Sequence, residues 1–158
     1  MAINKIYIGS DHRGFNLKQE IIVYLQTLNL QVSDCGNTIY DPDDDYTDYA
    51  LEVAKRVVAD NNSLGIVICG TGVGVSIVAN KISGARAALL DSIETTAIAR
   101  AHNHINILAL SSALPVEDVP YIVETFITTE PSYQERHIRR LSKIAELENN
   151  NPEYEIYN

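Results

Sequence analysis

Residues 65–81 read GIVICGTGVGVSIVANK and bring together an apolar run, a cysteine, three glycines at every second position and a second apolar run. The first run, residues 66–69, is apolar without alternation, which is typical of a parallel strand covered on both faces. Residues 73–81 are predicted to form a helix. A strand that passes through a glycine turn into a helix is a basic unit of an α/β fold.

The rest of the chain repeats this strand-and-helix unit. Further apolar segments predict strands at residues 3–9, 30–33, 85–90 and 105–110. Apolar residues at helical spacing predict helices at residues 15–28, 50–58, 92–102, 119–127 and 138–145. Because no hairpin signal separates the strands, we expect an α/β fold with a doubly wound, Rossmann-like sheet of five parallel strands. The expected organisation is a single domain over residues 1–148 with a C-terminal helix, followed by a polar tail over residues 149–158.

The composition excludes several classes of protein. The chain has 158 residues, 46% of them hydrophobic, which suits one globular domain with a substantial core. Twelve basic against 21 acidic side chains give a formal net charge of −9, which disfavours nonspecific binding to nucleic acid or to an anionic membrane. No apolar run is long enough to span a bilayer, and the first residues lack the pattern of a secretory signal. With only two cysteines, we expect free thiols and a cytoplasmic location.

The negative charge is concentrated in two segments. The acidic run at residues 41–45 is interpreted as an exposed loop, and the acidic, Asn-rich residues 146–155 as a frayed terminus. Because the chain as a whole repels anions, an anionic substrate has to be captured by a local cluster of donors.

The glycine turn is a candidate for such a local anion site. Gly70, Gly72 and Gly74 can adopt dihedral angles barred to other residues, so that successive N–H groups converge at a helix N-terminus. The spacing matches neither the dinucleotide-binding fingerprint nor the Walker motif. The alternative is a tight turn whose glycines only allow helix and strand to pack closely.

Cys69 stands at the end of the predicted strand, where the positive end of the next helix would stabilise a thiolate. The alternative role is that of a small buried hydrophobic residue. A thiol phosphatase would carry an arginine after five intervening residues, but Val75 occupies that position. The pattern therefore favours Cys69 as a proton-abstracting base, with the glycine amides facing a developing oxyanion.

Polar side chains elsewhere add further candidates. Asp11 and His12 follow the first predicted strand, and ligands of open parallel sheets bind beyond the carboxyl ends of the strands. Asp11 is also a suitable cap for the next helix, whereas the His12 imidazole is able to bind an anion or donate a proton. His102 and His104 would point to different faces of a helix, and no third ligand motif accompanies them, so we expect no metal.

Arg136 and Arg140 are four residues apart and share one face of the last predicted helix. Periodicity alone favours a solvated basic face. In so acidic a chain, a paired-arginine clamp for phosphate is the rival interpretation.

Taken in order along the chain, these residues resemble the ribose-5-phosphate isomerase B family, which also contains galactose-6-phosphate and allose-6-phosphate isomerases. The similarity covers nearly the whole chain, roughly to Glu148. So many matches in order are far more specific than any one of them. The matching segments are Gly9-Ser10-Asp11-His12-Arg13-Gly14-Phe15, Asp45-Tyr46-Thr47-Asp48-Tyr49-Ala50, Cys69-Gly70-Thr71-Gly72-Val73-Gly74, Asn80-Lys81, His102-Asn103, and Arg136-His137 with Arg140.

The resemblance implies an aldose–ketose isomerase of the pentose phosphate pathway. Such an enzyme interconverts D-ribose 5-phosphate and D-ribulose 5-phosphate through a cis-enediol(ate), without a metal or other cofactor. The residue matching Cys69 moves a proton between C1 and C2, and the residue matching Thr71 assists near the oxygens. The amides that stabilise the intermediate match Gly70, Gly72 and Gly74.

The resemblance also implies an active site that is shared between the subunits of a homodimer or homotetramer. The residue matching His102, lent with Asn103 by a neighbouring subunit, helps to open the sugar ring near the residue matching Asp11. Tyr46 would line the sugar pocket. The phosphate ligands would be His12, Arg136 and Arg140.

Three positions depart from the family pattern. Ala113 replaces a common arginine, so one phosphate contact is missing and a six-carbon substrate, allose or galactose 6-phosphate, is an alternative. His104 replaces a common aspartate and would alter the charge around His102. Thr47 replaces a common proline, which would loosen that loop.

Two functions from other classes stay open. The first is a noncatalytic sugar-phosphate or nucleotide-binding module, in which Cys69 only packs. The second, and the least favoured, is a metal-dependent phosphatase that uses His102, His104 and Asp11.

Overall fold

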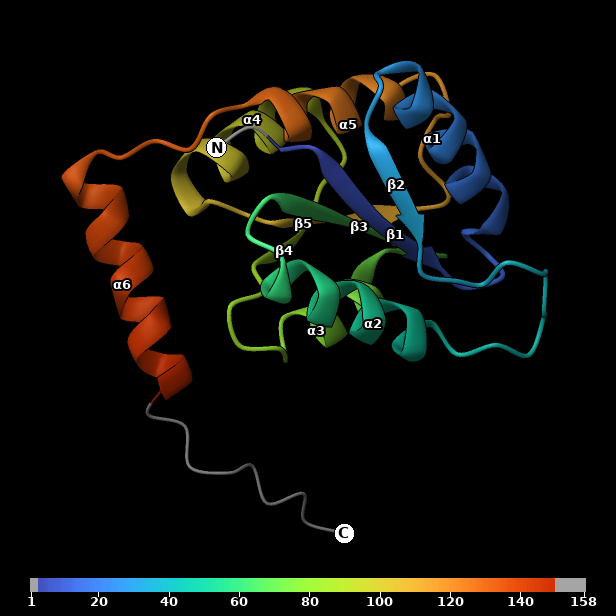
Figure 1. Cartoon of the computed structure of the whole chain (residues 1–158), viewed down its shortest axis with the longest axis horizontal. Helices are drawn as coiled ribbons and strands as arrows, with labels where there is room; N and C mark the ends of the chain where they lie inside the picture. Colours follow the sequence, from blue (N-terminus) through green and yellow to red (C-terminus); the bar gives the residue numbers. More distant parts are fainter. Residues whose placement is uncertain (1–2, 150–158) are drawn as a thin grey trace, which may run out of the picture.

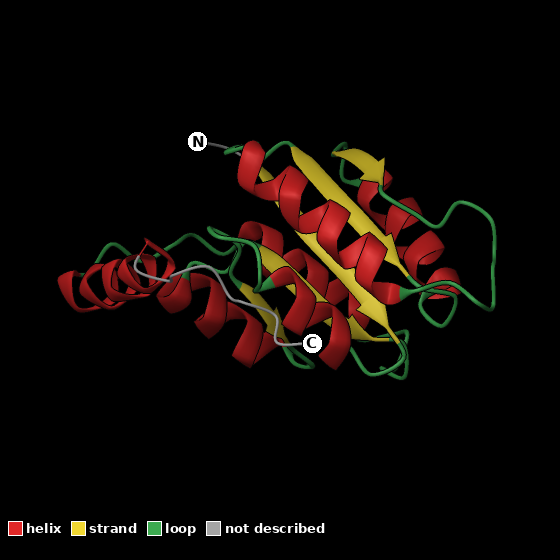
Figure 2. Ribbon diagram, turned by 90° about the horizontal axis from the view of Figure 1, so that it is seen from below, coloured by secondary structure: helices red, strands yellow, loops and turns green. Residues whose placement is uncertain are grey.

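The computed structural model describes residues 3–149, which form an open sheet between two layers of helices (Figure 1, Figure 2). All of its strands are parallel and lie in the order β2-β1-β3-β5-β4. The strands are β1 (Lys5–Ser10), β2 (Gln31–Asp34), β3 (Ser63–Cys69), β4 (Ala87–Leu89) and β5 (Ile107–Ser111). The helices are α1 (Phe15–Thr27), α2 (Tyr46–Ala59), α3 (Val73–Ala79), α4 (Ile93–Asn103), α5 (Val119–Thr128) and α6 (Glu135–Asn149).

Strand β3, the centre of the sheet, carries the cysteine. All seven of its residues are buried, and it pairs with β1 on one side and with β5 on the other. The register places Ile68 beside Ser10 and Cys69 beside Ser111. The end of β3 therefore lies between the ends of its two neighbours, whose following loops border the same space.

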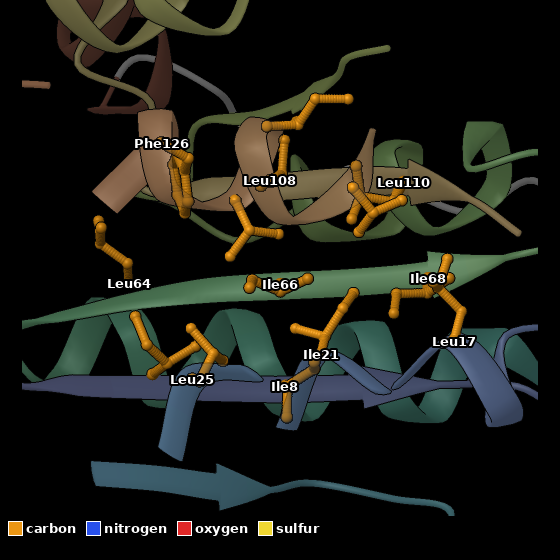
Figure 3. Packing of buried hydrophobic residues seen from close by; sticks show 14 of the residues in the cluster. Ile8, Leu17, Ile21, Leu25, Leu64, Ile66, Ile68, Leu108, Leu110 and Phe126 are labelled. Atoms are coloured by element: carbon orange, nitrogen blue, oxygen red, sulfur yellow. The ribbon is translucent and has the colours of Figure 1, made fainter. Parts of the chain in front are cut away.

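Apolar side chains cover both faces of the sheet, which confirms the doubly wound arrangement. One cluster lies between the sheet and α1, α4 and α5, and it includes the fully buried Ile66, Leu108 and Phe126 (Figure 3). The other cluster, on the side of α2 and α3, includes Val53 and Cys69. Full burial of one large apolar side chain stabilises a fold by about 1.5–3 kcal/mol. Both layers together hold the strand ends in place.

The predicted order of strands and helices is confirmed throughout residues 3–149. Helix α2 begins at Tyr46, earlier than its apolar stripe indicated, because its first turn is exposed and polar. The predicted frayed terminus is wrong for residues 146–149, which continue α6 as regular helix. The rest of the predicted polar tail, residues 150–158, lies outside the described residues. Within the described part of the chain, no helix is long and apolar enough to cross a membrane.

Helix α6 lies at the side of the fold, where its Glu148 carboxylate accepts hydrogen bonds from Ser83 Oγ at 3.2 Å and the Gly84 N–H at 3.1 Å. It extends along the left of Figure 1, with α4 as its main neighbour. Its apolar residues Ile138, Ile144 and Leu147 are 38%, 42% and 71% exposed. Because exposed apolar stripes of this kind are typical of interaction surfaces, the helix presents a face that residues 3–149 leave largely uncovered.

Lys18 is a buried charge that fixes the loop after β2. Its Nζ donates to both carboxylate oxygens of Asp34 at 2.7 Å and to the main-chain carbonyl of Asn37 at 2.6 Å. The Lys18 side chain is fully buried, whereas that of Asp34 keeps contact with solvent. These bonds tie the loop to α1.

We expect Lys18→Met to lower the free energy of unfolding by about 2 kcal/mol, because a carboxylate and a carbonyl lose their donor. Urea denaturation measures this change. Lys55→Met removes an exposed lysine of α2 and is the matched control, with an expected change within about 0.5 kcal/mol. Equal stability of the Lys18 variant and the wild type would contradict the role given to this lysine.

Candidate active site

The loops after β1 and β3 meet at the carboxyl edge of the sheet. From β1 the chain first moves outward to β2 and then returns to β3 on the other side of β1. Ligands of open α/β sheets bind at such switch points. The Asp11 amide donates to the carbonyl of Ile68 at 3.4 Å and thereby joins the two loops. We call the candidate residues at this edge the cysteine cluster: Cys69, Thr71, Asp11, His12, Tyr46, Gly70, Gly72 and Gly74.

The Cys69 sulfur accepts a main-chain hydrogen bond. The Gly72 N–H donates to Sγ at 3.1 Å, and Cys69 is 5% exposed. Gly72 has a φ of +75°, and a Cβ on it would meet the Leu89 side chain and lie 2.9 Å from the main chain of Leu110. Only glycine fits both this dihedral angle and this space. The turn therefore places a thiol and a main-chain donor side by side at the positive end of α3.

Tyr46 and Thr71 border the glycine turn. A Cβ on Gly74 would lie 2.7 Å from the Tyr46 ring, so this ring covers the glycine. Tyr46 is the first residue of α2 and is 39% exposed. Thr71 is exposed, and its Oγ1 accepts the N–H of Val73 at 3.3 Å. An aromatic ring and a hydroxyl thus reach the solvent side of the turn.

Asp11 is a buried carboxylate in the loop after β1. Its Oδ1 accepts the N–H of Gly14 at 3.0 Å, directly before α1, as expected of a residue that satisfies donors at a helix start. Arg13 was not assigned to the site from the sequence, yet it lies against the turn. A Cβ on Gly70 would lie 2.7 Å from the Arg13 Nε. Its place after a strand end, within a segment that resembles the family, was the signal that could have indicated this guanidinium.

His12 is held by a residue of the acidic run. Asp44 Oδ1 accepts the His12 main-chain N–H at 2.9 Å and bonds to the ring Nδ1 at 2.7 Å. Asn37 Nδ2 donates to Asp44 Oδ2 at 2.6 Å. The Asp44 side chain is 4% exposed, so the interpretation of residues 41–45 as an exposed loop is wrong at this position. The reason is that three protein donors take the place of water around the carboxylate.

A second group of candidate residues lies where α4 ends and α6 begins. His102 and Asn103 are exposed in the last turn of α4. The rings of His102 and His137 are 4.2 Å apart between centroids. Arg136 and Arg140 are exposed on α6. We call His102, Asn103, Arg136 and Arg140 the histidine cluster.

His137 supports this cluster, although its only signal in the sequence was its place in a segment that resembles the family. It is 2% exposed, and its Nε2 accepts the Nε–H of Arg136 at 3.1 Å. Burial, followed by the charge of neighbouring histidines and arginines, lowers the pKa of His137, so that its ring is neutral at neutral pH. A neutral ring is able to accept from Arg136 and to pack against His102.

The cysteine and histidine clusters lie at opposite edges of the sheet. In a parallel sheet, each connecting helix runs back against the direction of the strands. Helix α4 starts beyond the carboxyl end of β4 and ends at Asn103, before β5 begins. The strand arrowheads accordingly point away from the side on which α6 stands (Figure 1, Figure 2). A single chain therefore keeps the two clusters apart.

The three departures from the family pattern have different surroundings. His104 ends α4 with a φ of 48°, and its Nε2 hydrogen-bonds to the carbonyl of Ser132 at 2.8 Å. Ala113 lies in the turn after β5, where its N–H donates to Ser111 Oγ at 3.1 Å and its methyl group supplies no charge. Thr47 is exposed in the first turn of α2, a position that also accommodates proline.

The described residues include no group suited to a metal ion, and the second cysteine, Cys35, does not belong to the cysteine cluster. Among residues 3–149, no three His, Cys, Asp or Glu side chains gather into a group that could hold a metal ion. Asp11 lies at the opposite edge from His102 and His104, so these three do not form a site within one chain. Burial raises the pKa of the Cys35 thiol to about 11, which keeps it protonated at neutral pH. Both cysteines are free thiols, as predicted.

Sequence comparison identifies close relatives over nearly the full length. The family model described as Ribose/Galactose Isomerase matches residues 6–144. The ribose-5-phosphate isomerase B of Mycolicibacterium paratuberculosis is 46% identical over 145 residues, which are 91% of this chain and 91% of that protein. The ribose-5-phosphate isomerase B of Mycobacterium tuberculosis is 43% identical over 149 residues, which are 94% of this chain and 92% of that protein.

Solved structures of the same kind superpose well on the fold. Ribose-5-phosphate isomerase B from Mycoplasma genitalium, with bound ribulose-5-phosphate, has a TM-score of 0.89 and 40% identity, covering 96% of this chain and 100% of that one. The enzyme from Clostridium thermocellum has a TM-score of 0.87 and 41% identity, covering 92% and 97%. Fold, sequence and family model agree over most of the length, and the chain therefore belongs to the ribose/galactose isomerase family.

Proposed function

We propose that this protein is an aldose–ketose isomerase that interconverts D-ribose 5-phosphate and D-ribulose 5-phosphate. Relatives more than 40% identical over nearly the whole chain are ribose-5-phosphate isomerases B, and one similar structure holds ribulose-5-phosphate. The single observation that supports the chemistry is the hydrogen bond that the Gly72 N–H donates to the Cys69 sulfur, at the switch point of the sheet. A base beside main-chain donors is what proton transfer next to a carbonyl group requires.

In the proposed reaction, the Cys69 thiolate removes the proton from C2 of the open-chain aldose. The electron pair of the broken C2–H bond forms the C1–C2 double bond, and the carbonyl oxygen on C1 takes the negative charge. The thiol then returns its proton to C1, while the O2 hydroxyl becomes the ketone and its proton passes to O1. The Thr71 hydroxyl and the N–H groups of the glycine turn would stabilise these oxygens, and each such donor contributes roughly 10²- to 10³-fold to turnover.

We infer that a second copy of the chain completes the site. The histidine cluster is able to reach a cysteine cluster only in a neighbouring copy, because one chain holds them at opposite edges of its sheet. Exposed apolar residues lie on the elements beside both clusters: Val73 and Ile77 on α3, and Ile144 and Leu147 on α6. Two-fold pairing would bury these surfaces and create two equal sites. A homotetramer would be a pair of such dimers.

The remaining candidate residues would act on the two ends of the sugar. In the shared site, His102 and Asn103 of one copy would open the sugar ring next to Asp11 of the other. Tyr46, which lies across the glycine turn, would line the sugar pocket. The phosphate would be held by His12, Arg136 and Arg140.

No metal or other cofactor enters this reaction, because the sulfur and the main-chain donors supply both the base and the charge stabilisation. The net charge of −9 argues against nucleic acid or a membrane as partner. A cytoplasmic location is our expectation from the free thiols.

A turnover assay with several aldose phosphates tests the proposal. The purified protein is expected to convert ribose 5-phosphate with a kcat/KM at least about tenfold above that for allose or galactose 6-phosphate. The six-carbon alternative derives from Ala113, and a reversed preference would establish it in place of the five-carbon substrate. Binding of ribose 5-phosphate without turnover would instead identify a noncatalytic module. A chelator is expected to leave the rate unchanged.

A further inference from the structure

Asp44 is the member of the acidic run that turns inward. Asp41, Asp43 and Asp45 are exposed, whereas the side chain of Asp44 is 4% exposed. Burial of a carboxylate is unfavourable unless hydrogen bonds replace its water. Both oxygens of Asp44 meet this condition, because Oδ1 accepts from His12 and Oδ2 accepts from Asn37.

The bonds to His12 fix the orientation of its ring. One oxygen, Asp44 Oδ1, contacts both the main-chain N–H at 2.9 Å and the ring Nδ1 at 2.7 Å. A carboxylate only accepts hydrogen bonds, so Nδ1 carries the proton in this contact. The Tyr40 ring packs edge-on against the imidazole, 6.4 Å away between centroids. With Nδ1 directed at Asp44, Nε2 lies on the far side of the ring, and 29% of the side chain is open to solvent.

Asp44 is itself supported by buried structure. Asn37, which donates to its Oδ2 at 2.6 Å, is 8% exposed. The Asn37 N–H donates to the carbonyl of Ser10 at 3.2 Å, and its own carbonyl accepts from the buried Lys18 at 2.6 Å. A chain of hydrogen bonds thus runs from the core side of α1 to the imidazole in the loop after β1.

We propose that Asp44 is a positioning residue for phosphate binding, which holds the His12 ring so that Nε2 points at the phosphate of the sugar substrate. This inference rests on the proposed function, in which His12 is a phosphate ligand. Nδ1 donates to Asp44 while Nε2, when protonated, donates to the phosphate. The carboxylate then offsets the positive charge of the ring on its buried side, as in other pairs of histidine and carboxylate.

The test compares three variants of the full-length protein. Asp44→Ala is expected to raise the KM for ribose 5-phosphate and the Ki for inorganic phosphate roughly 10- to 100-fold, the usual scale for a lost hydrogen bond to a charged group. Because substrate and transition state use this contact equally, kcat is expected to change by less than about threefold. Asp44→Asn keeps an acceptor oxygen and is expected to fall between Asp44→Ala and the wild type. Asp43→Asn removes an exposed charge from the same loop and is the control, with unchanged constants.

A spectroscopic measurement separates ring orientation from loss of fold. In ¹⁵N-histidine NMR of the wild type, His12 is expected to carry its proton on Nδ1, with the signal assigned by His12→Gln. The Asp44→Ala variant is expected to shift this proton toward Nε2 while the other histidine signals stay in place. An unchanged His12 tautomer together with an unchanged Ki for phosphate would overturn the inference.

The same experiment distinguishes this inference from the proposed function. Titration of the wild type with inorganic phosphate moves the His12 signal if the ring binds the anion, whether or not the protein turns over a sugar. A wild type that binds phosphate through His12 but converts no aldose would refute the isomerase and leave the role of Asp44 standing. If the protein converts the aldose but the His12 signal does not shift when phosphate is added, the role of Asp44 is refuted and the isomerase is left standing.

Discussion

Cys69→Ala is expected to lower kcat for ribose 5-phosphate by roughly a hundredfold or more, the usual scale for a positioned base. The variant is expected to fold, because it removes one sulfur atom at the end of a strand whose other residues remain buried. Rates of ketose formation give kcat, and circular dichroism with urea denaturation reports the fold. An intact fold with wild-type turnover would contradict the proposed mechanism and favour the binding module.

Two further variants make this result specific to the thiolate. Cys69→Ser keeps an acceptor for the Gly72 N–H but is not ionised near neutral pH, so its kcat is expected to fall about as far as that of the alanine variant. Wild-type turnover in the serine variant would mean that catalysis requires only a hydrogen-bond acceptor at position 69 and not a base. Cys35→Ala is the control, because burial raises the pKa of that thiol to about 11, and activity within about twofold of the wild type is expected.

The fold could be predicted because its strongest signals are local. Residues 66–69 are apolar without alternation, and a strand of this kind is stable only between two helical layers, so it predicted a covered parallel sheet. The glycine turn was equally informative, since the φ of +75° at Gly72 is a conformation that glycine adopts readily and side chains of other residues rarely allow. Both conclusions depend on neighbours in the sequence and need no knowledge of distant contacts.

The parts of the candidate site that depend on distant contacts could not be predicted. Asp44 belongs to a run of acidic residues without periodicity, and its inward turn results from donors on His12 and Asn37, which come from other segments. His137 stood out in the sequence only as part of a segment that resembles the family, and its burial follows from contact with the end of α4. Which one of several similar residues becomes buried is therefore decided by tertiary contacts.

The separation of the two clusters, by contrast, follows from topology. A residue directly after a parallel strand lies at the carboxyl edge of the sheet, and a residue at the end of the following helix lies at the amino edge. Cys69 belongs to the first kind and His102 to the second. The resemblance implied a shared site, and strand direction alone gives a physical reason for it.

Mixed dimers of Cys69→Ala and His102→Ala are therefore expected to regain activity that neither variant has alone. If each site takes Cys69 from one copy and His102 from the other, one of the two sites in a mixed dimer contains both defects. The other site contains neither. The mixed dimer is expected to show roughly half of the wild-type kcat per dimer on ring-closed ribose 5-phosphate, because the two sites of a two-fold dimer are equivalent.

The matched control pairs Cys69→Ala with Asp11→Ala, since both residues belong to the cysteine cluster of one chain. Each site of that mixed dimer keeps one defect, so no activity is expected to return. Co-expression with two different tags and sequential purification on both isolates the mixed species for either pair. Recovery with Asp11→Ala would mean that Asp11 and Cys69 of one site come from different copies. A lack of recovery with His102→Ala would mean that Cys69 and His102 of one site come from the same copy or that they belong to separate sites. Only a site assembled across the subunit boundary predicts recovery in the first pair and its absence in the second.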